Sequence, residues 1–234
     1  MSIELKLGDC NKLLKDIPDN SVDLVIMDPP YGKNNNSCRI QGGGCFGNRN
    51  RDYLNQIGEL YTGYNFTEIL DELKRIMKKV NIYIWCNKEQ IPIYLNYFED
   101  CNFDILTWHK TNPVPACDNK YLPDTEYLLF FREPGVKLYG TYDSKKHYYI
   151  TPINKQDKKL YKHPTVKPLN IITNLVINSS VEGDIILDPF MGTGTTGVAA
   201  SANNRSFIGI EIDDAYFNVA KNRIEEVNNN LWNL

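Results

Sequence analysis

The segment Ile185-Ile-Leu-Asp-Pro-Phe-Met-Gly-Thr-Gly-Thr-Thr196 decides the fold, because it leads from a short apolar run into a glycine loop. The residues that follow, Gly197-Val-Ala-Ala-Ser-Ala202, are small and suit a helix. A strand, a glycine loop and a helix in this order present backbone N–H groups at the helix start, where small residues let a ligand come close. The spacing fits neither common phosphate-binding pattern, and Asp188 would repel a phosphate. The segment therefore predicts a site for a cationic or hydroxyl-bearing ligand.

The next predicted strand, Ser206-Phe-Ile-Gly-Ile-Glu211, ends in an acid. In doubly wound folds, an acid roughly 20 residues after the glycine loop binds ribose hydroxyl groups. The glycine loop and Glu211 together predict a nucleoside site without a convincing phosphate site. An ordinary strand–helix–strand unit with a solvated Glu211 has the same spacing and stays an alternative.

Another polar cluster, Asp28-Pro29-Pro30-Tyr31, follows the apolar run Val22-Asp-Leu-Val-Ile-Met27. Prolines fix the backbone, lack an N–H group and push the preceding residue into an extended conformation. Such a turn holds carbonyl oxygens outward with no internal donor competing for them. A carboxylate, carbonyl groups and an aromatic ring in one place suit a planar substrate that carries an NH₂ group. The alternative is a Pro-Pro strand terminator with a surface tyrosine.

Short apolar runs and amphipathic segments alternate along the chain, which predicts an α/β fold. We expect strands over 3–7, 22–27, 81–86, 103–108, 125–131, 185–187 and 206–211, and helices over 11–17, 66–79, 90–100, 170–178, 197–202 and 215–227. This order predicts a single doubly wound, mostly parallel sheet with helices on both faces and an antiparallel strand. Four acids, Asp9, Asp28, Asp188 and Glu211, fall at predicted strand ends and should share one edge of that sheet.

The composition is that of an ordinary globular domain. The chain has 234 residues, 42% of them hydrophobic, and a net charge of −3, so we expect one domain over 1–234. It has no apolar stretch long enough to span a membrane and no signal peptide, which favours a cytoplasmic protein. The six cysteines form no Cys-x-x-Cys pair, so we expect neither a disulfide framework nor a metal site.

In this order, Asp28-Pro-Pro-Tyr31 and the segment from Asp188 to Thr196 resemble the motifs of the S-adenosylmethionine-dependent DNA amino-methyltransferases. Because the tetrapeptide precedes the glycine loop, the chain resembles the circularly permuted beta group of this family. Leu7-Gly-Asp-Cys10, His163-Pro-Thr-Val-Lys-Pro168 and Ile208-Gly-Ile-Glu-Ile212 also resemble family segments, so the resemblance covers most of the chain. It implies a Rossmann-like methyltransferase fold, circularly permuted.

The resemblance also implies a role for individual residues. The catalytic ones would be Asp28, Pro29, Pro30 and Tyr31. The residues around S-adenosylmethionine would be Asp9, Cys10, Asp28, His163, Thr165, Lys167, Pro168, Asp188, Pro189, Phe190, Gly192, Gly194, Thr195, Thr196, Glu211 and Ile212. Among these, Glu211 would bind the ribose and Asp9 the adenine amine. His163, Thr165 and Lys167 would lie near the carboxylate of the cofactor.

Two polar segments are candidates for contact with double-stranded DNA. Residues 32–63 are rich in Asn and Gly without periodicity, and we expect a mobile loop beside Tyr31; an insertion without a role is the alternative. Residues 133–162 mix lysines with aromatic residues and lie where the family has its target-recognition region; a solvated lysine-rich loop is the alternative. The predicted DNA contacts are Tyr31, Lys33, Arg49, Arg51, Lys110, Asn112, Lys145, Lys146, Lys158 and Lys159.

The expected reaction is methylation of the N6 amine of adenine in a base flipped out of the duplex. Asp at the first position of the tetrapeptide favours adenine, because the cytosine-N4 enzymes of the family more often begin with Ser. The alternatives are a cytosine-N4 enzyme, an RNA or protein amino-methyltransferase, a non-catalytic cofactor-binding subunit and a plain nucleotide-binding module. The recognition region is short, so a homodimer or a separate specificity partner is a further expectation.

Overall fold

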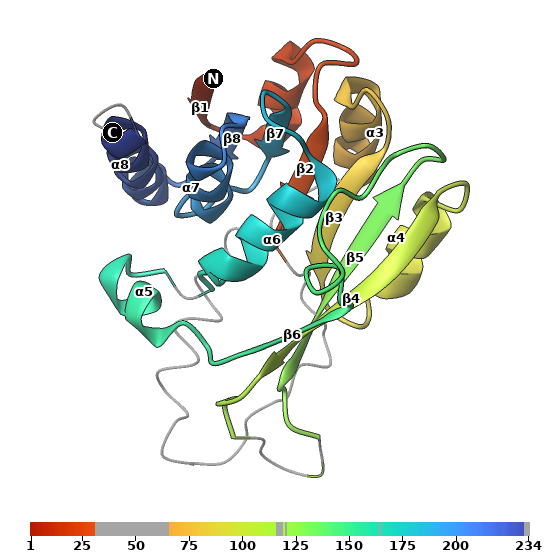
Figure 1. The fold of residues 1–234 in the computed structure, drawn as a ribbon, viewed down its shortest axis with the longest axis vertical. Helices are drawn as coiled ribbons and strands as arrows, with labels where there is room; N and C mark the ends of the chain where they lie inside the picture. Colours follow the sequence, from red (N-terminus) through yellow and green to blue (C-terminus); the bar gives the residue numbers. More distant parts are fainter. Residues whose placement is uncertain (31–65, 116–118, 120, 164, 232–234) are drawn as a thin grey trace.

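The computed structural model describes residues 1–30, 66–115, 119, 121–163 and 165–231. Within these ranges, one eight-stranded sheet has the order β1-β8-β7-β2-β3-β5-β4-β6. The strands are β1 (Ile3–Leu7), β2 (Leu24–Met27), β3 (Asn81–Cys86), β4 (Asn102–Lys110), β5 (Thr125–Arg132), β6 (Tyr148–Thr151), β7 (Ile185–Asp188) and β8 (Ser206–Glu211). The predicted α/β fold with a single sheet is confirmed (Figure 1).

Neighbouring strands are parallel throughout the sheet except where β5 pairs with β3 and β4. The predicted mostly parallel sheet with an antiparallel strand is therefore confirmed. β2 and β7 are neighbours, with Leu24 opposite Ile186, although they lie far apart in the sequence. As a result, Asp28 after β2 and Asp188 at the end of β7 reach the same edge of the sheet.

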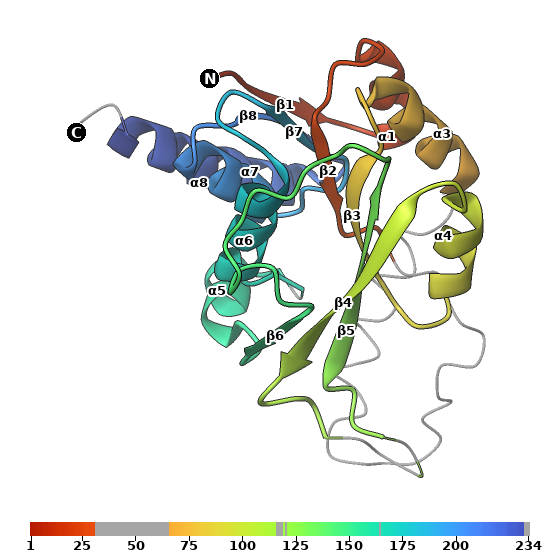
Figure 2. The ribbon, with the colours of Figure 1, turned by 45° about the vertical axis from the view of Figure 1, so that its right-hand side comes forward.

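Helices cover both faces of the sheet (Figures 1 and 2). One face carries α1 (Cys10–Leu13), the 3₁₀ turn η1 (Leu14–Asp16), α3 (Phe66–Ile76) and α4 (Ile91–Tyr97), and the other carries α6 (Leu169–Ser179), α7 (Thr195–Ala202) and α8 (Asp214–Leu231). Alternate residues of β2 belong to different cores: Val25 packs on the α3 side and Ile26 on the α6 side. Burial on both faces explains why such strands are continuous apolar runs.

The structure corrects some predicted limits. The helix predicted over 66–79 ends at Ile76, because Met77 forms a β-bridge with Val22 and the Lys78 N–H donates to the Val22 carbonyl. For the same reason, the strand predicted over 22–27 begins only at Leu24. The helix predicted over 11–17 is the short α1 followed by η1.

Residues 133–162 contain two elements that we did not predict, β6 and the helix α5 (Lys155–Leu160). β6 is an edge strand paired with β4, where Thr107 lies opposite Tyr148. Asn154 caps α5 by accepting a hydrogen bond from the Asp157 N–H. The run Tyr148-Tyr-Ile-Thr151 favours a strand, and this signal is hidden among flanking lysines.

None of the helices in the described ranges has the length and the apolar character needed to cross a bilayer. The loop predicted over 32–63 lies outside the described residues, as do Tyr31, Lys33, Arg49 and Arg51.

Candidate active site

The glycine loop joins β7 to α7 and needs glycine at two positions. Gly192 and Gly194 have φ angles of 52° and 79°, in the left-handed region that other residues rarely adopt. A Cβ atom on Gly194 would also lie 2.8 Å from the Cβ of Ala220 in α8. The sequence Gly192-Thr-Gly194 thus turns the chain sharply and brings the start of α7 close to the ends of the strands.

Asp188 is buried beneath this loop. Its Oδ2 accepts a hydrogen bond from Thr196 Oγ1 at 2.6 Å, and its Oδ1 accepts one from the Phe190 N–H at 3.0 Å. Burial, aided by the charges of Asp28 and Glu211, raises the pKa of Asp188 to about 7, although these two hydrogen bonds act in the opposite direction. The Asp188 carboxyl therefore gains or loses its charge near neutral pH.

Glu211 holds the other side of the loop. Its Oε2 accepts from the Gly192 N–H and its Oε1 from the Asp213 N–H, both at 2.8 Å. Burial raises the pKa of Glu211. The backbone carbonyl of Glu211 accepts from the Gly8 N–H, so Asp9, which caps α1 through the Asn11 N–H, lies at the neighbouring strand end. The prediction that the four acids share one edge of the sheet is confirmed by the parallel pairing of β1, β8, β7 and β2.

Asp28 is the start of a chain of alternating charges. Its Oδ2 accepts from Lys167 Nζ at 2.6 Å, and Lys167 Nζ lies 3.3 Å from Glu126 Oε2. The other oxygen of Glu126 lies 2.7 Å from Lys110 Nζ. Lys167 is 8% exposed, so its cation is enclosed by acids instead of by water.

Lys167 and Glu126 both stay ionised at neutral pH. Burial alone would lower the pKa of Lys167, but Asp28 and Glu126 outweigh it and raise that pKa. Burial alone would raise the pKa of Glu126, but Lys167 and Lys110 outweigh it and lower that pKa. We did not predict Glu126 from the sequence, where the one available signal is an acid at the start of an otherwise apolar strand.

The segment between α5 and α6 packs on the glycine loop. Burial, helped by Lys167 and Lys158, lowers the pKa of His163 to about 4, so the imidazole is neutral. Its ring meets Tyr216 of α8 edge to face at 4.4 Å. From the same helix, Arg223 donates to the Thr193 carbonyl at 2.6 Å and lies over the Tyr161 ring. α8 therefore ties the glycine loop to the segment that follows α5.

The remaining predicted cofactor residues lie near the glycine loop, and the predicted DNA contacts lie on β4, α5 and the segments next to them. Pro168 caps α6, Thr165 donates its N–H to His163 Nδ1, and Cys10, Pro189, Thr195 and Ile212 lie in or next to the same edge segments. Asn112 accepts from the Ile153 N–H at 2.6 Å and so joins the strand β4 to the start of the α5 segment. Lys158 and Lys159 lie on α5.

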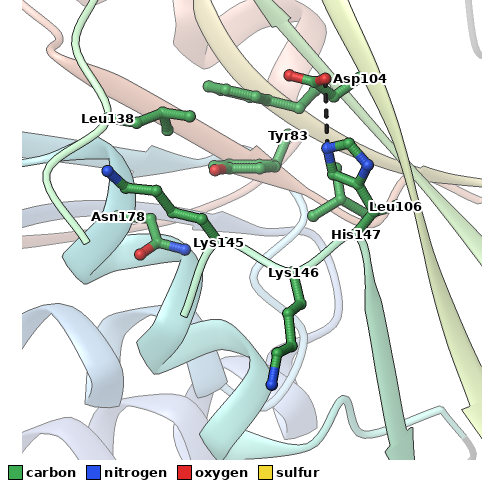
Figure 3. A pocket seen from close by; sticks show the side chains of 9 residues that line it. Tyr83, Asp104, Leu106, Leu138, Lys145, Lys146, His147 and Asn178 are labelled. Carbon is green, nitrogen blue, oxygen red and sulfur yellow. Dashed lines mark ion pairs between the residues drawn. The ribbon is translucent and has the colours of Figure 1, made fainter. Parts of the chain in front are cut away.

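Lys145 and Lys146 do not join this site. They line a small cavity with Tyr83, Asp104 and Asn178, where His147 Nε2 lies 3.5 Å from Asp104 (Figure 3). Asp104 lies near the start of β4, whereas the active-site acids lie at the opposite ends of the parallel strands. Lys146 is engaged by Asp143 at 2.7 Å.

Comparison with known proteins gives concordant matches. The family model described as DNA methylase matches residues 22–222. The Type II methyltransferase M2.LlaDCHI of Lactococcus lactis subsp. cremoris is 33% identical over 94% of this chain and 88% of its own length. The crystal structure of the M1.HpyAVI–SAM complex has a TM-score of 0.69 at 26% identity and covers 94% of this chain and 99% of that one. The cytosine-N4-specific PvuII DNA methyltransferase has a TM-score of 0.71 over 100% of this chain and 93% of its own, but at 15% identity it shares only the fold.

Proposed function

The chain belongs to the DNA methylase family, and we propose that it methylates the N6 amine of adenine in double-stranded DNA. As a member of that family, it is an S-adenosylmethionine-dependent DNA amino-methyltransferase with the Rossmann-like fold of these enzymes. The observation that carries the choice of adenine is Asp28, an acid at the first position of the tetrapeptide, at the strand end beside the glycine loop. Family members that act on cytosine N4 more often have Ser there.

The residues around the glycine loop fit S-adenosylmethionine. Its sulfonium supplies an already activated methyl group, so the protein need only bind, align and exclude water. Asp188, Glu211 and Asp28 give this edge of the sheet a negative potential that attracts a cation. We assign the ribose hydroxyls to Glu211, the methionine part to Asp188 and Phe190, and the adenine amine to Asp9.

Asp28 activates the target amine in this proposal. An exocyclic amine is conjugated with its ring and is a weak nucleophile. When its two N–H groups donate to the Asp28 carboxylate and the Pro29 carbonyl, the nitrogen becomes more tetrahedral and its lone pair becomes available. Alignment contributes on the order of several kcal/mol to the rate. Loss of the Asp28 acceptor should cost about 10²–10³ in rate, by analogy with oxyanion-hole donors.

The target base must leave the duplex to reach Asp28. We propose Tyr31, which lies outside the described residues, as its stacking partner. We assign phosphate contacts to Lys158 and Lys159 on α5 and to Asn112, whereas Lys110 is paired with Glu126. The similarity to a Type II methyltransferase favours a role in restriction-modification, in the cytoplasm. We further propose that residues 32–63, a second subunit or a separate specificity partner contributes to recognition of the DNA sequence.

Parallel methylation assays on three classes of substrate test the proposal. The protein is incubated with methyl-labelled S-adenosylmethionine and, in separate reactions, duplex DNA of mixed sequence, RNA of the same sequence and a protein extract. We expect label in DNA alone, recovered after digestion as N6-methyl-2′-deoxyadenosine. Label in N4-methyl-2′-deoxycytidine would show that the target is cytosine instead of adenine. Label in RNA or protein without label in DNA would refute the proposed function.

A further inference from the structure

We propose that Lys167 and Glu126 act as a positioning pair for Asp28, in which Glu126 anchors Lys167 and Lys167 fixes one oxygen of the catalytic carboxylate. The inference rests on the proposed function, in which Asp28 accepts a hydrogen bond from the target amine. It gives Lys167 a different role from the one that the family resemblance implies, near the carboxylate of the cofactor. It also gives a role to Glu126, which no sequence motif identified.

Four different elements bring these charges together. Asp28 follows β2, Lys167 lies just before α6, Glu126 lies near the start of β5, and Lys110 ends β4. Because β5 runs against its neighbours, its first residues reach the edge at which β2 and β4 end. The ammonium of Lys167 is thus held between Asp28 at 2.6 Å and Glu126 at 3.3 Å.

The burial of Lys167 makes this arrangement hard to explain as a surface ion pair. Its side chain is 8% exposed, and its Nζ lies 4.9 Å from the centre of the Trp85 ring. A buried cation is costly unless it is paired and hydrogen-bonded. Two acids, Glu126 and the catalytic Asp28 itself, therefore enclose one buried lysine.

Glu126 offsets the positive charge that the lysines bring to the site. A single buried cation next to Asp28 would repel the cationic methyl donor that the site has to accept. Asp28 and Glu126 together balance the charges of Lys167 and Lys110, and without Glu126 these groups would carry one net positive charge. The acids that face the donor, Asp188 and Glu211, then keep their effect.

Lys167 fixes the orientation of the Asp28 carboxylate. Lys167 Nζ donates to Asp28 Oδ2 at 2.6 Å, so the carboxylate that accepts from the amine in the proposed function is held in one orientation. Among the described residues, Asp188 on β7 and Cys86 at the end of β3 also interact electrostatically with Asp28, and Lys167 stabilises the ionised form of Asp28 against the charge of Asp188. Burial raises the pKa of Cys86 to about 12, so its thiol adds no charge. Removal of Lys167 should therefore raise the pKa of Asp28, as expected for an acid that loses a neighbouring cation.

Three variants of the full chain test the pair: Lys167→Met, Lys167→Arg and Glu126→Gln. The control is Lys221→Met, which removes an exposed lysine on α8. For each, we measure the single-turnover methylation rate on duplex DNA between about pH 5 and 9, the dissociation constant of S-adenosylmethionine, and the melting temperature.

For Lys167→Met we expect a rate about 10²-fold lower at neutral pH, and an acid limb of the pH profile that moves up by about one unit or more. The dissociation constant of the methyl donor should not increase. Lys167→Arg should return the acid limb toward that of the wild type, because it restores the cation. Glu126→Gln should weaken donor binding without moving the acid limb upward, because Lys167 keeps its charge but loses its balance.

The inference is overturned if Lys167→Met keeps the wild-type rate and acid limb, or if Lys167→Arg and Lys167→Met have the same unshifted limb. If Lys167→Met does not fold, Glu126→Gln decides the question by itself: weaker donor binding with an acid limb that does not move upward supports the pair, and wild-type donor binding overturns it. Asp28→Ala separates this inference from the proposed function. An active Asp28→Ala variant would refute the assigned mechanism, whereas an inactive one beside a normal Lys167→Met would refute only the positioning pair.

Discussion

Asp188→Asn should make cofactor binding insensitive to pH and should stabilise the free protein. Burial raises the pKa of Asp188 to about 7, so the side chain is about one tenth ionised at about pH 6 and mostly ionised at about pH 8. If the ionised form attracts the cationic methyl donor, the wild-type dissociation constant should fall about tenfold over that interval. The Asn variant should show the weaker affinity throughout. Its amide can keep both local hydrogen bonds, accepting from the Phe190 N–H and donating to Thr196 Oγ1.

The effect on stability has the opposite sign. A folded-state pKa raised above the unfolded value means that the folded protein holds the proton more tightly. The stability from that proton is present at low pH and is lost as the pH rises through about 7. At about pH 8, free Asp188→Asn protein should therefore be more stable than the wild type, by an amount on the order of a few kcal/mol before structural relaxation reduces it.

Calorimetric titration with S-adenosylmethionine at several pH values measures the affinity, and denaturant unfolding of the free protein measures the stability. Glu225→Gln is the control, because it removes an exposed acid on α8. The reasoning is refuted if the wild-type affinity does not change between about pH 6 and 8, or if Asp188→Asn destabilises the free protein at about pH 8.

Three further predictions concern the loop that holds the cofactor. Gly194→Ala should destabilise the protein by about 1–2 kcal/mol for its left-handed backbone plus about 1–3 kcal/mol for the contact with Ala220, measured by denaturant unfolding. Gly183 has a φ of 87° and open space at its Cβ position, so Gly183→Ala should show only the backbone cost in the same assay. Arg223→Met should leave the Thr193 carbonyl without its buried donor and weaken S-adenosylmethionine binding by about tenfold. Lys221→Met on the same helix should leave that binding unchanged, and equal affinities of the two variants in a calorimetric titration would show that Arg223 does not support the glycine loop. Glu211→Ala should raise the same dissociation constant by about 10–100-fold, from the loss of a charged hydrogen-bond acceptor, and an unchanged constant would remove Glu211 from the ribose site.

Much of the fold could be predicted because its strands are buried on both faces. β2, β3, β7 and β8 are short apolar runs, and β7 leads into a glycine loop whose positive φ angles only glycine adopts readily. Their parallel pairing then requires that Asp28, Asp188 and Glu211 meet at one edge. The edge strand β6 and the helix α5 escaped prediction, since lysine-rich flanks conceal a four-residue strand.

The pairing of Lys167 with Glu126 could not be predicted for a different reason. The two residues lie far apart in the sequence and meet only because β5 is antiparallel to the strands around it. Sequence spacing reports which residues share an element, but the partner of a buried charge depends on which elements become neighbours in the sheet. From the sequence we expected Lys167 near the carboxylate of the cofactor and could name no partner for its charge, whereas in the structure Lys167 is one of the most enclosed cations among the described residues.

The central claim is that Asp28 accepts the target amine of adenine at the edge of the sheet where the methyl donor binds. The most direct test compares wild-type and Asp28→Ala protein by single-turnover methylation of duplex DNA with methyl-labelled S-adenosylmethionine, followed by mass spectrometry of the nucleosides. The account predicts N6-methyl-2′-deoxyadenosine from the wild type, and none from the variant although it still binds the methyl donor. Wild-type amounts of N6-methyl-2′-deoxyadenosine from Asp28→Ala would contradict it.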